Sequence, residues 1–298
     1  MPINTGNFGE LLEPGIRLIY GNAYKTYLEQ YTKIFTVINS SKATEHTLSM
    51  SGFGLIPTKT EGASVEYDTA IQGFKNSITH ITYGKGFMVS SEMIEDDKYG
   101  EINRLPKALA RSVRVTVEQT AADVFNRAFN SSYTATSDSK EMCATDHPLI
   151  GGGTYANELT TSADFSQTSL QQALIDIGDM VDDRGMLLNA NPARVVGPSE
   201  LATTFKVILG STLDPDSANN AINPYKGIMP FEINNYLTDP DAWFILTDVP
   251  DGPTFYWRRK PAFTRDGDFD SESAKWKVVF RMSVGWTDPR GVFGSPGA

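Results

Sequence analysis

Carboxylates are the first candidates for chemistry in this sequence. The stretch SSEMIEDDKYG, residues 90–100, carries Glu92, Glu95, Asp96 and Asp97 close together, and oxygen ligands of this kind suit a hard cation. The spacing of a calcium-binding loop, with its central glycine and terminal glutamate, is missing. The pattern therefore favours a short helix or turn whose acidic face is solvated, and we predict no metal site.

A thiol and an imidazole form the second candidate. His147 follows Cys143 by four residues in the segment CATDHPL, and a cysteine beside a histidine base can act as a nucleophile. Such a pair needs contact in space and an oxyanion site, and a spacing of four in a proline-flanked loop supplies neither. Glycines 151–153 lack the ending of a phosphate loop and predict a flexible turn. His46 and His80 stand alone and predict surface positions. We therefore predict no catalytic or cofactor site.

The composition narrows the class of protein. A chain of 298 residues with 40% hydrophobic residues can bury a substantial core. Its 26 basic and 36 acidic residues give a net charge of −10, which argues against a general phosphate-binding surface for nucleic acid. The sequence shows neither a signal peptide nor a long apolar run. With a single cysteine it allows no intramolecular disulfide, and these features together predict a globular, cytoplasmic protein.

The sequence pattern predicts different kinds of element in successive parts of the chain. Residues 1–46 are rich in turns and include aromatic side chains at helical spacing, which predicts an arm with a short helix. Residues 47–90 read as a long hairpin with little core, which must lie on something else because an isolated ribbon is marginal. Residues 103–130 hold a continuous apolar stripe and predict a helix that starts near Pro106.

A second, α/β portion follows from residue 167. SLQQALIDIGDMVDD predicts an amphipathic helix, ARVVGP a buried strand, and SELATTFKVILGS a helix opened by a Ser/Glu capping signature. Residues 211–227 form a long polar loop. WFILTD and TFYWRRKP flank a PDGP turn and predict a hairpin. KWKVVFRMSVGW alternates apolar and polar residues and predicts a half-buried strand over 275–286.

Four segments in this order carry a family resemblance: YGKGFMVSSEMIEDDKYG, HPLIGGGTYANEL, NYLTDPDAWFIL and the ending VVFRMSVGWTDPRGVFGSPGA. Over nearly its whole length the chain resembles the major capsid protein of tailed bacteriophages, with the Hong Kong 97-like fold, and most closely the Mu-type major head subunit. The resemblance implies an α+β protein with four parts. These are an N-terminal arm (1–46), an extended loop built as a β-hairpin (47–90), a peripheral domain (91–166 and 256–298) with spine helix 103–130, and an axial domain (167–255). Residues 83–100 would join the hairpin to the spine.

The function that this resemblance implies is structural rather than enzymatic. Identical subunits would form hexamers and pentamers, and these an icosahedral shell around double-stranded phage DNA, assembled in the host cytoplasm. Implied partners are a scaffolding protein, a maturation protease, a portal protein, a cement or decoration protein, and DNA packaged without sequence-specific binding. Neither a cofactor nor a membrane is implied.

The residues expected at subunit interfaces are mostly charged or polar side chains of the extended loop, the joint, the spine helix and the polar loop. Alternating charges of this kind suit rim contacts that fix register more than they add affinity. The candidates are Lys59, Glu61, Glu66, Tyr67, Asp68, Lys75, Glu95, Asp96, Asp97, Arg104, Arg111, Arg114, Asp214, Asp216, Asn219 and Asn220.

Two further features of the family can be compared with the residues. Some members join subunits by an isopeptide bond between a lysine of the extended loop and an asparagine near the C-terminus. Lys59 could supply the lysine, but no asparagine follows Asn235, so we expect no such cross-link and a shell held by non-covalent contacts. Some members also carry a helical scaffolding segment before the arm; here the resemblance implies a separate scaffold or a processed chain.

Two alternatives remain at this point. An encapsulin-type bacterial compartment shell shares the fold and would bind a cargo peptide. A soluble α/β hydrolase would need Cys143 and His147 as nucleophile and base.

Overall fold

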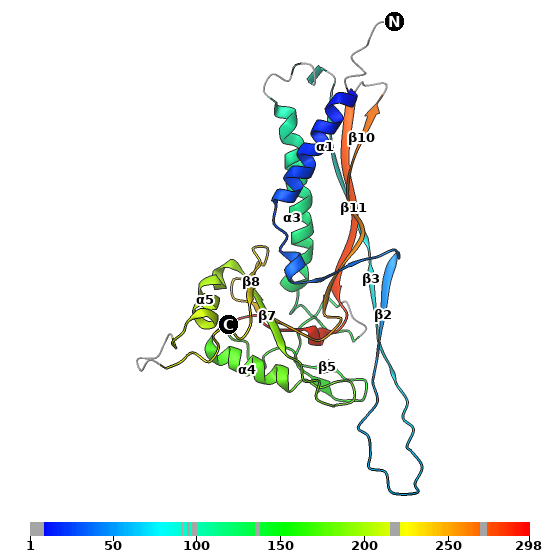
Figure 1. The fold of residues 1–298 in the computed structure, drawn as a ribbon, viewed down its shortest axis with the longest axis vertical. Helices are drawn as coiled ribbons and strands as arrows, with labels where there is room; N and C mark the ends of the chain where they lie inside the picture. Colours follow the sequence, from blue (N-terminus) through cyan, green and yellow to red (C-terminus); the bar gives the residue numbers. More distant parts are fainter. Residues whose placement is uncertain are drawn as a thin grey trace.

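The computed structural model describes residues 9–90, 92–93, 96, 100–134, 138–214, 221–268 and 273–298. They form an elongated α+β molecule in which helices run lengthwise along a sheet of long strands, beside a smaller α/β unit (Figure 1). A narrow hairpin projects from the end that holds the α/β unit (Figure 1). In the described residues, helices long and apolar enough to cross a bilayer are absent.

The long sheet has the strand order β1-β10-β11-β4. Its strands are β1 (Thr36–Asn39), β10 (Pro253–Asp268), β11 (Ser273–Trp286) and β4 (Ile81–Val89). On β11 the side chains alternate between a buried face and a more exposed one, as an amphipathic strand requires. The predicted strand over 275–286 is confirmed, with Trp276, Phe280 and Trp286 on the buried face.

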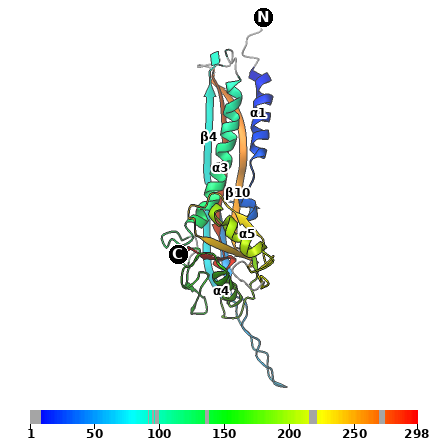
Figure 2. The same cartoon turned by 90° about the vertical axis from the view of Figure 1, so that its left-hand side faces the viewer.

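Two helices cover that buried face. Helix α3 (Arg104–Asn126) has Pro106 in its first turn, where a proline needs no amide hydrogen. It is roughly 35 Å long at about 1.5 Å per residue, and it ends a few residues before the predicted limit of 130. Helix α1 (Gly9–Thr26) packs along α3 and β10, with Tyr20 stacked on Phe263 at 4.6 Å between ring centroids. Figure 2 shows α1, α3 and β4 running side by side along the molecule.

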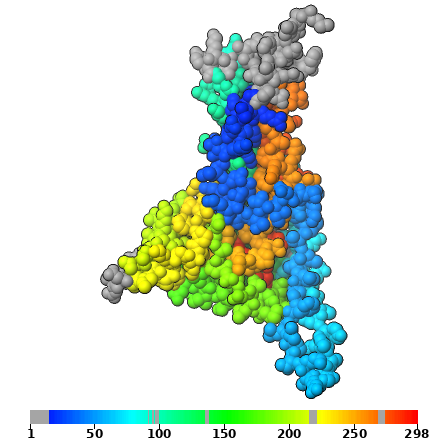
Figure 3. Space-filling view, in the orientation of Figure 1, coloured from blue at the N-terminus to red at the C-terminus, as the bar shows by residue number. Residues whose placement is uncertain are grey.

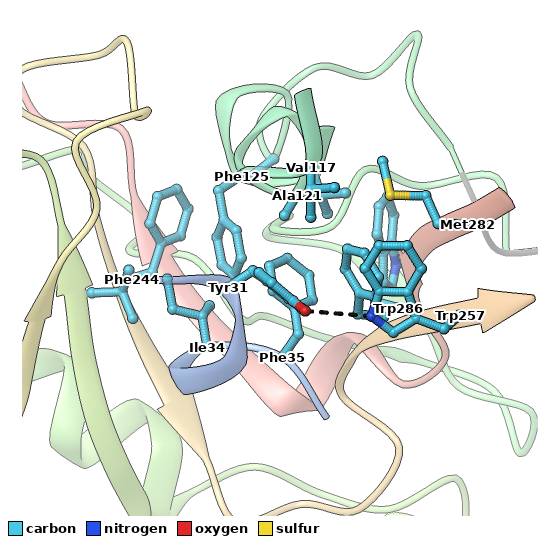
Figure 4. Packing of buried hydrophobic residues seen from close by; sticks show 14 of the residues in the cluster. Tyr31, Ile34, Phe35, Val117, Ala121, Phe125, Phe244, Trp257, Met282 and Trp286 are labelled. Carbon is cyan, nitrogen blue, oxygen red and sulfur yellow. Dashed lines mark hydrogen bonds between the residues drawn. The ribbon is translucent and has the colours of Figure 1, made fainter. Parts of the chain in front are cut away.

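Aromatic side chains dominate the core between helix and sheet (Figure 4). The short 3-10 helix η2 (Tyr31–Lys33) inserts Tyr31 there, and the indole nitrogen of Trp257 donates to the Tyr31 hydroxyl at 3.3 Å. Phe125 of α3 meets Phe35 and Phe244 edge to face at 5.5 and 5.0 Å between ring centroids. Because Phe244 belongs to the α/β unit, this core joins both parts of the molecule.

The α/β unit is built on a sheet of order β12-β9-β7-β8. Its strands are β7 (Pro192–Gly197), β8 (Phe231–Ile233), β9 (Trp243–Thr247) and β12 (Val292–Ser295), and its helices are α4 (Gln167–Gly178) and α5 (Ala202–Gly210). Smaller elements are β5 (His147–Pro148), β6 (Thr154–Tyr155) and the 3-10 helices η3 (Glu101–Asn103), η4 (Ser199–Leu201) and η5 (Pro289–Gly291). Glycines 151–153 form the predicted turn, between β5 and β6.

The expected helices and the buried strand of this unit are confirmed, but the expected capping differs. The capping box belongs to α4, where Ser166 and Ser169 satisfy each other's amides. The predicted Ser/Glu signature instead starts η4, and Leu201, at the N-cap of α5, makes no side-chain cap bond. Ser199 lies two residues before this N-cap, inside η4, and its hydroxyl donates to the Glu200 carboxylate at 3.0 Å.

The hairpin predicted around the PDGP turn is wrong. Strand β9 pairs with β12 and β7, whereas β10 pairs with β1 and β11, so the turn passes from one sheet to the other. The last strand, β12, also lies in the α/β sheet, whereas the expected boundary assigns it to the spine side. Strand β12 is there because it pairs antiparallel with β9. The side-chain amide of Asn157 also holds its start, donating to the backbone oxygens of Pro289 at 2.9 Å and Val292 at 3.0 Å.

The predicted long hairpin is shorter than expected. Strands β2 (Thr44–Met50) and β3 (Gln72–Thr79) pair antiparallel and enclose residues 51–71, which contain no strand. After His80 the chain leaves the hairpin and enters the long sheet as β4. Tyr83 and Phe87 stack there on Phe280 and Trp276, each at 5.2 Å between centroids, so aromatic burial draws 81–89 away from the hairpin.

Candidate assembly interface

Residues 51–71 are the strand-free part of the expected extended loop, and from here on the name means these residues alone. They project beyond the body of the molecule (Figure 3, light blue, lower right). Bulky apolar side chains are exposed along it: Phe53, Leu55, Ile56, Val65 and Tyr67. Leu55 is 84% and Ile56 95% exposed. Clustered apolar exposure of this kind marks a binding surface, because a monomer gains nothing from it.

The charged candidates of the loop are exposed as well. Lys59, Glu61 and Glu66 lie around its tip, where the amide of Ala63 donates to the carbonyl of Thr60 at 3.1 Å. Lys75 is exposed on β3 of the hairpin. None of these four shows an ion pair within the described part of this subunit, which leaves them available to a partner.

Asp68 is different, because the subunit itself engages it. Its carboxylate accepts the amide hydrogen of Gly54 at 2.9 Å and lies 3.2 Å from a guanidinium nitrogen of Arg184. Hydrogen bonds from the amides of Gly54 and Thr69, and then the charge of Arg184, hold the pKa of Asp68 below its usual range. At neutral pH the carboxylate is therefore charged and already partnered.

The joint and the spine place their candidates in different environments. Asp96 is exposed, whereas Glu95 and Asp97 lie outside the described residues. On α3, Arg111 is exposed, and Arg104 is exposed but paired with Glu101 at 2.9 Å.

Arg114 is buried, which makes it unsuitable as a surface contact. Its guanidinium reaches Glu29 at 2.6 Å and the carbonyl of Tyr24 at 3.1 Å, and it lies 3.9 Å from the centre of the Tyr24 ring. Beside it, Glu118 accepts the amide of Tyr31 at 3.0 Å, and burial raises the pKa of its carboxyl. Arg114 thus fastens the arm to the spine inside one subunit.

The polar loop is described only at its two ends. Asp214 accepts a hydrogen bond from the side chain of Gln167 at 2.7 Å, and its own amide donates to the carbonyl of Ala221 at 2.8 Å. The other candidates of this loop, Asp216, Asn219 and Asn220, lie outside the described residues.

A basic surface covers the face of the long sheet opposite α3. The register of the sheet places Lys275, Lys277 and Arg281 of β11 on the face that alternates away from the core, with Arg259 opposite Arg281 on β10. On β4, Gly86 faces Lys277 and Thr82 faces Arg281, whereas the larger Met88 faces Lys275. On β10, the acidic Asp266 faces Lys275. The basic side chains Lys277, Arg259 and Arg281 thus gather on this face, in contrast to the net acidic charge of the whole chain.

The thiol and imidazole considered for catalysis are both fully buried. Burial raises the pKa of Cys143 well above its ordinary value, which suppresses the reactive thiolate. His147 is held by Asp138 at 2.9 Å and stacks on Tyr155. These surroundings are those of structural side chains in a core rather than of a nucleophile and its base.

His46 is exposed as expected, but the surface position expected for His80 is wrong. Its ring is buried and contacts the Ser283 hydroxyl at 2.9 Å and Glu45 at 3.4 Å. It lies where the hairpin meets the long sheet, and Tyr256 closes over it, so tertiary packing covers a residue that the sequence pattern leaves exposed.

Sequence reasoning selected the charges of the extended loop and Tyr67, and missed its other exposed apolar side chains. Leu55 and Ile56 occur in a polar segment without helical or strand periodicity, and apolar residues outside any amphipathic pattern are the signal that could have revealed them. Arg184 was also missed as a contact of the loop. Groups of acidic, histidine or cysteine side chains able to hold a metal are absent from the described residues.

Comparison with known proteins gives a family. The model of the family described as "Phage capsid protein" matches residues 75–294, which is most of the chain. No curated protein matches the sequence significantly.

Solved structures share the fold at low identity. The procapsid protein of bacteriophage JBD30 is 17% identical with a TM-score of 0.55, covering 98% of this chain and 76% of that one. The capsid protein of a native GTA particle is 14% identical with a TM-score of 0.55, covering 91% and 92%. A virus-like particle from Pyrococcus furiosus is 9% identical with a TM-score of 0.56, covering 95% and 98%. At these identities the likeness establishes the fold.

Proposed function

This chain belongs to the phage capsid protein family and is a major capsid shell protein with the Hong Kong 97-like fold, and we propose that its extended loop joins neighbouring subunits in the shell. The family match favours this function over a bacterial compartment shell and over a hydrolase. Subunits would associate as hexamers and pentamers in an icosahedral lattice, with the long-sheet unit at the periphery and the α/β unit near the symmetry axes.

The observation that carries the proposal is the exposure of Leu55 and Ile56 at the end of a projecting hairpin. Burying one such side chain is worth about 1.5 to 3 kcal/mol, and each copy in a closed lattice can donate one loop and receive one. Many modest contacts of this kind make an assembled shell hard to dismantle.

Charge suggests where the loop docks on the neighbour. The acidic residues Glu61 and Glu66 at its tip outnumber Lys59 there, and the helix-free face of the long sheet presents Lys277 and Arg281. Opposite charges at a rim orient the partners more than they add affinity. The exposed candidates Tyr67, Lys75, Asp96, Arg104 and Arg111 would contribute further contacts of this kind.

Several partners remain part of the proposal. Assembly would take place in the host cytoplasm with a scaffolding protein, a maturation protease and a portal protein, and a cement protein could reinforce the outer surface. The DNA would be packaged without sequence-specific contacts, since the net charge of −10 does not favour tight binding of phosphates.

Electron microscopy combined with size-exclusion chromatography tests the proposal. The unaltered protein, with its scaffold, should form closed shells or rings, and the double variant Leu55→Ser/Ile56→Ser should remain unassembled while folded. Ile175→Ser is the matched control, because Ile175 is also an exposed apolar residue but lies on α4. Shells formed equally well by the loop variant would remove the loop from the mechanism, and an unaltered protein that stays a monomer would contradict the assembly itself.

A denaturing gel of mature particles tests the chemistry of the contacts. With Lys59 in the loop but no asparagine after Asn235, we expect a single band at the mass of the subunit. A ladder of covalent oligomers would show that a cross-link forms by another pair of residues.

A further inference from the structure

The extended loop begins where the hairpin ladder ends. The amide of Ser51 donates to the carbonyl of Ile71 at 3.0 Å, and the amide of Ile71 donates to the Ser51 hydroxyl at 3.0 Å. Below this rung the hairpin is fixed to the body, because the side chain of Asn76 bonds to the carbonyl of Trp286 and Ile78 packs against Gly285. Residues 52–70 therefore lie beyond the last paired residues of the hairpin, and the hairpin itself is packed on the body of the molecule.

Arg184 ties this projecting part to the body of the molecule. Its guanidinium lies 3.2 Å from the Asp68 carboxylate and donates to the carbonyl of Thr69 at 2.5 Å. Asp68 in turn bonds to the amide of Gly54 on the opposite side of the loop. Among the described residues, Arg184 makes the only hydrogen bonds between 52–70 and the rest of the chain.

The turn that carries Arg184 is rigid. The Asp182 carboxylate accepts the amides of Arg184 at 2.8 Å and Met186 at 2.9 Å. The neighbouring Asp183 pairs with the largely buried Arg290 at 2.7 Å, and its carbonyl accepts the amide of Gly151 at 3.0 Å. A side chain on a turn held from three sides is a fixed point from which a flexible segment can be oriented.

The exposure of the pair indicates that the tie is reversible. The side chain of Arg184 is 18% exposed and that of Asp68 is 42% exposed, so solvent and salt weaken their attraction. Ion pairs of this kind shift a local equilibrium without locking it. The pair can therefore set the direction of the loop at little cost to its later adjustment.

We propose that Arg184 and Asp68 form a latch that orients the extended loop in the unassembled subunit and so prepares its exposed apolar side chains, Leu55 and Ile56, for docking on a second copy. The inference rests on the proposed assembly function of the loop. A loop that is oriented before docking loses less conformational freedom when it binds. Release of the latch leaves Leu55 and Ile56 unchanged but spreads them over more orientations, which lowers the affinity between subunits.

Spin-label distances in the unassembled protein test the latch directly. Labels at Thr60→Cys on the loop and Gln171→Cys on α4 report the direction of the loop, and the native Cys143 is fully buried and so protected from labelling. We expect one main distance with the latch intact. Arg184→Gln should raise the population of other distances about twofold to fivefold, the range for a partly exposed ion pair.

Two controls separate the latch from a general loss of charge. Arg194→Gln removes a comparable ion pair, to Glu232 at 3.3 Å within the body, and should leave the distances unchanged. Asp68→Asn should broaden them as Arg184→Gln does, and the double variant should broaden them by less than the sum of the two, because both remove the same ion pair. Salt at about 1 M should broaden the distances of the unaltered protein but not those of the Arg184→Gln variant.

The assembly readout is the protein concentration needed for shell formation, which Arg184→Gln should raise about twofold to fivefold. Unchanged distances in Arg184→Gln would overturn the latch, whether or not shells form. Shells that form at lower concentration in this variant would overturn its preparatory role. If the unaltered protein forms no shell, the assembly function fails, while the distances still decide whether the latch exists.

Discussion

Strand β11 and the extended loop both carry bulky apolar side chains, but those of β11 are buried in the subunit and those of the loop are exposed to solvent. On β11, Trp276, Phe280 and Trp286 are at most 3% exposed, whereas Leu55 and Ile56 on the loop are at least 84% exposed. The alternation of β11 gives its side chains a common face that helices can cover. The loop has no such face, so its burial has to come from another copy. Folding and assembly thus depend on different apolar residues.

The largest loss of folding stability is expected for a truncation on β11. Trp286→Ala removes a fully buried indole from the core and should lower the free energy of unfolding by about 3 to 5 kcal/mol. Chemical denaturation followed by circular dichroism measures the loss. Ile56→Ala, an apolar truncation on the loop, is the control and should cost less than about 0.5 kcal/mol. Equal losses would show that the loop is part of the folding core.

The next largest loss of folding stability is expected when the contact between the N-terminal arm and helix α3 is broken. Arg114→Met breaks the buried contact with Glu29 and Tyr24 and leaves the buried Glu118 without its cation, so the free energy of unfolding should fall by about 2 to 4 kcal/mol. Arg111→Met, on the exposed face of the same helix, should change it by less than about 0.5 kcal/mol. A loss in Arg111→Met as large as in Arg114→Met would contradict the separation of core and surface arginines.

Glu158, which lies beside β12, should make the folding stability depend on pH. Burial, with the charge of Glu141 adding to it, raises the pKa of Glu158 to about 7, while the unfolded value is about 4.3. The folded state therefore holds more protons within this window, so its stability is full below about pH 4.3 and falls as the pH rises towards 7. Partial solvent contact limits the loss to about 1 to 2 kcal/mol.

Chemical denaturation at several pH values measures how steeply the free energy of unfolding falls with pH; this slope is the quantity compared below. Glu158→Gln should remove the contribution between about pH 4.3 and 7. Asp164→Asn, an exposed carboxylate of the same region, serves as the control and should leave the slope in place. A slope that persists in Glu158→Gln would assign the proton to another group.

The smallest effect on subunit stability is expected for the residues that matter most for assembly. Leu55→Ser/Ile56→Ser should change the free energy of unfolding by less than about 0.5 kcal/mol, because both side chains already lie in water. A thermal unfolding scan of the unassembled protein measures it. A drop of several degrees would mean that the loop packs against its own subunit in solution, and the contrast with β11 would then be lost.

Local patterns predicted the elements whose packing is decided within one segment. The stripe on α3 and the alternation of β11 each specify one buried face, and both were found near the expected limits. The pairing of β9 was not predictable from the strand that follows it across the PDGP turn, because two strands distant in sequence, β7 and β12, take both of its edges. Arg114 and His80 were misplaced for a related reason. Their burial depends on Glu29 and Glu45, which a pattern confined to one helix or strand does not contain.

The sequence by itself determined the long helix and the amphipathic strand, because hydrophobic periodicity is a local property. The order of its segments carried the resemblance to a shell protein, and that resemblance implied the α+β class. Only the tertiary structure decided which strands share a sheet, which arginines are buried and how Arg184 meets Asp68. Those outcomes depend on contacts between residues far apart in the sequence, 85 positions for Arg114 and Glu29 and 116 for Arg184 and Asp68. Such contacts are set by the packing of whole units rather than by the spacing of neighbouring residues.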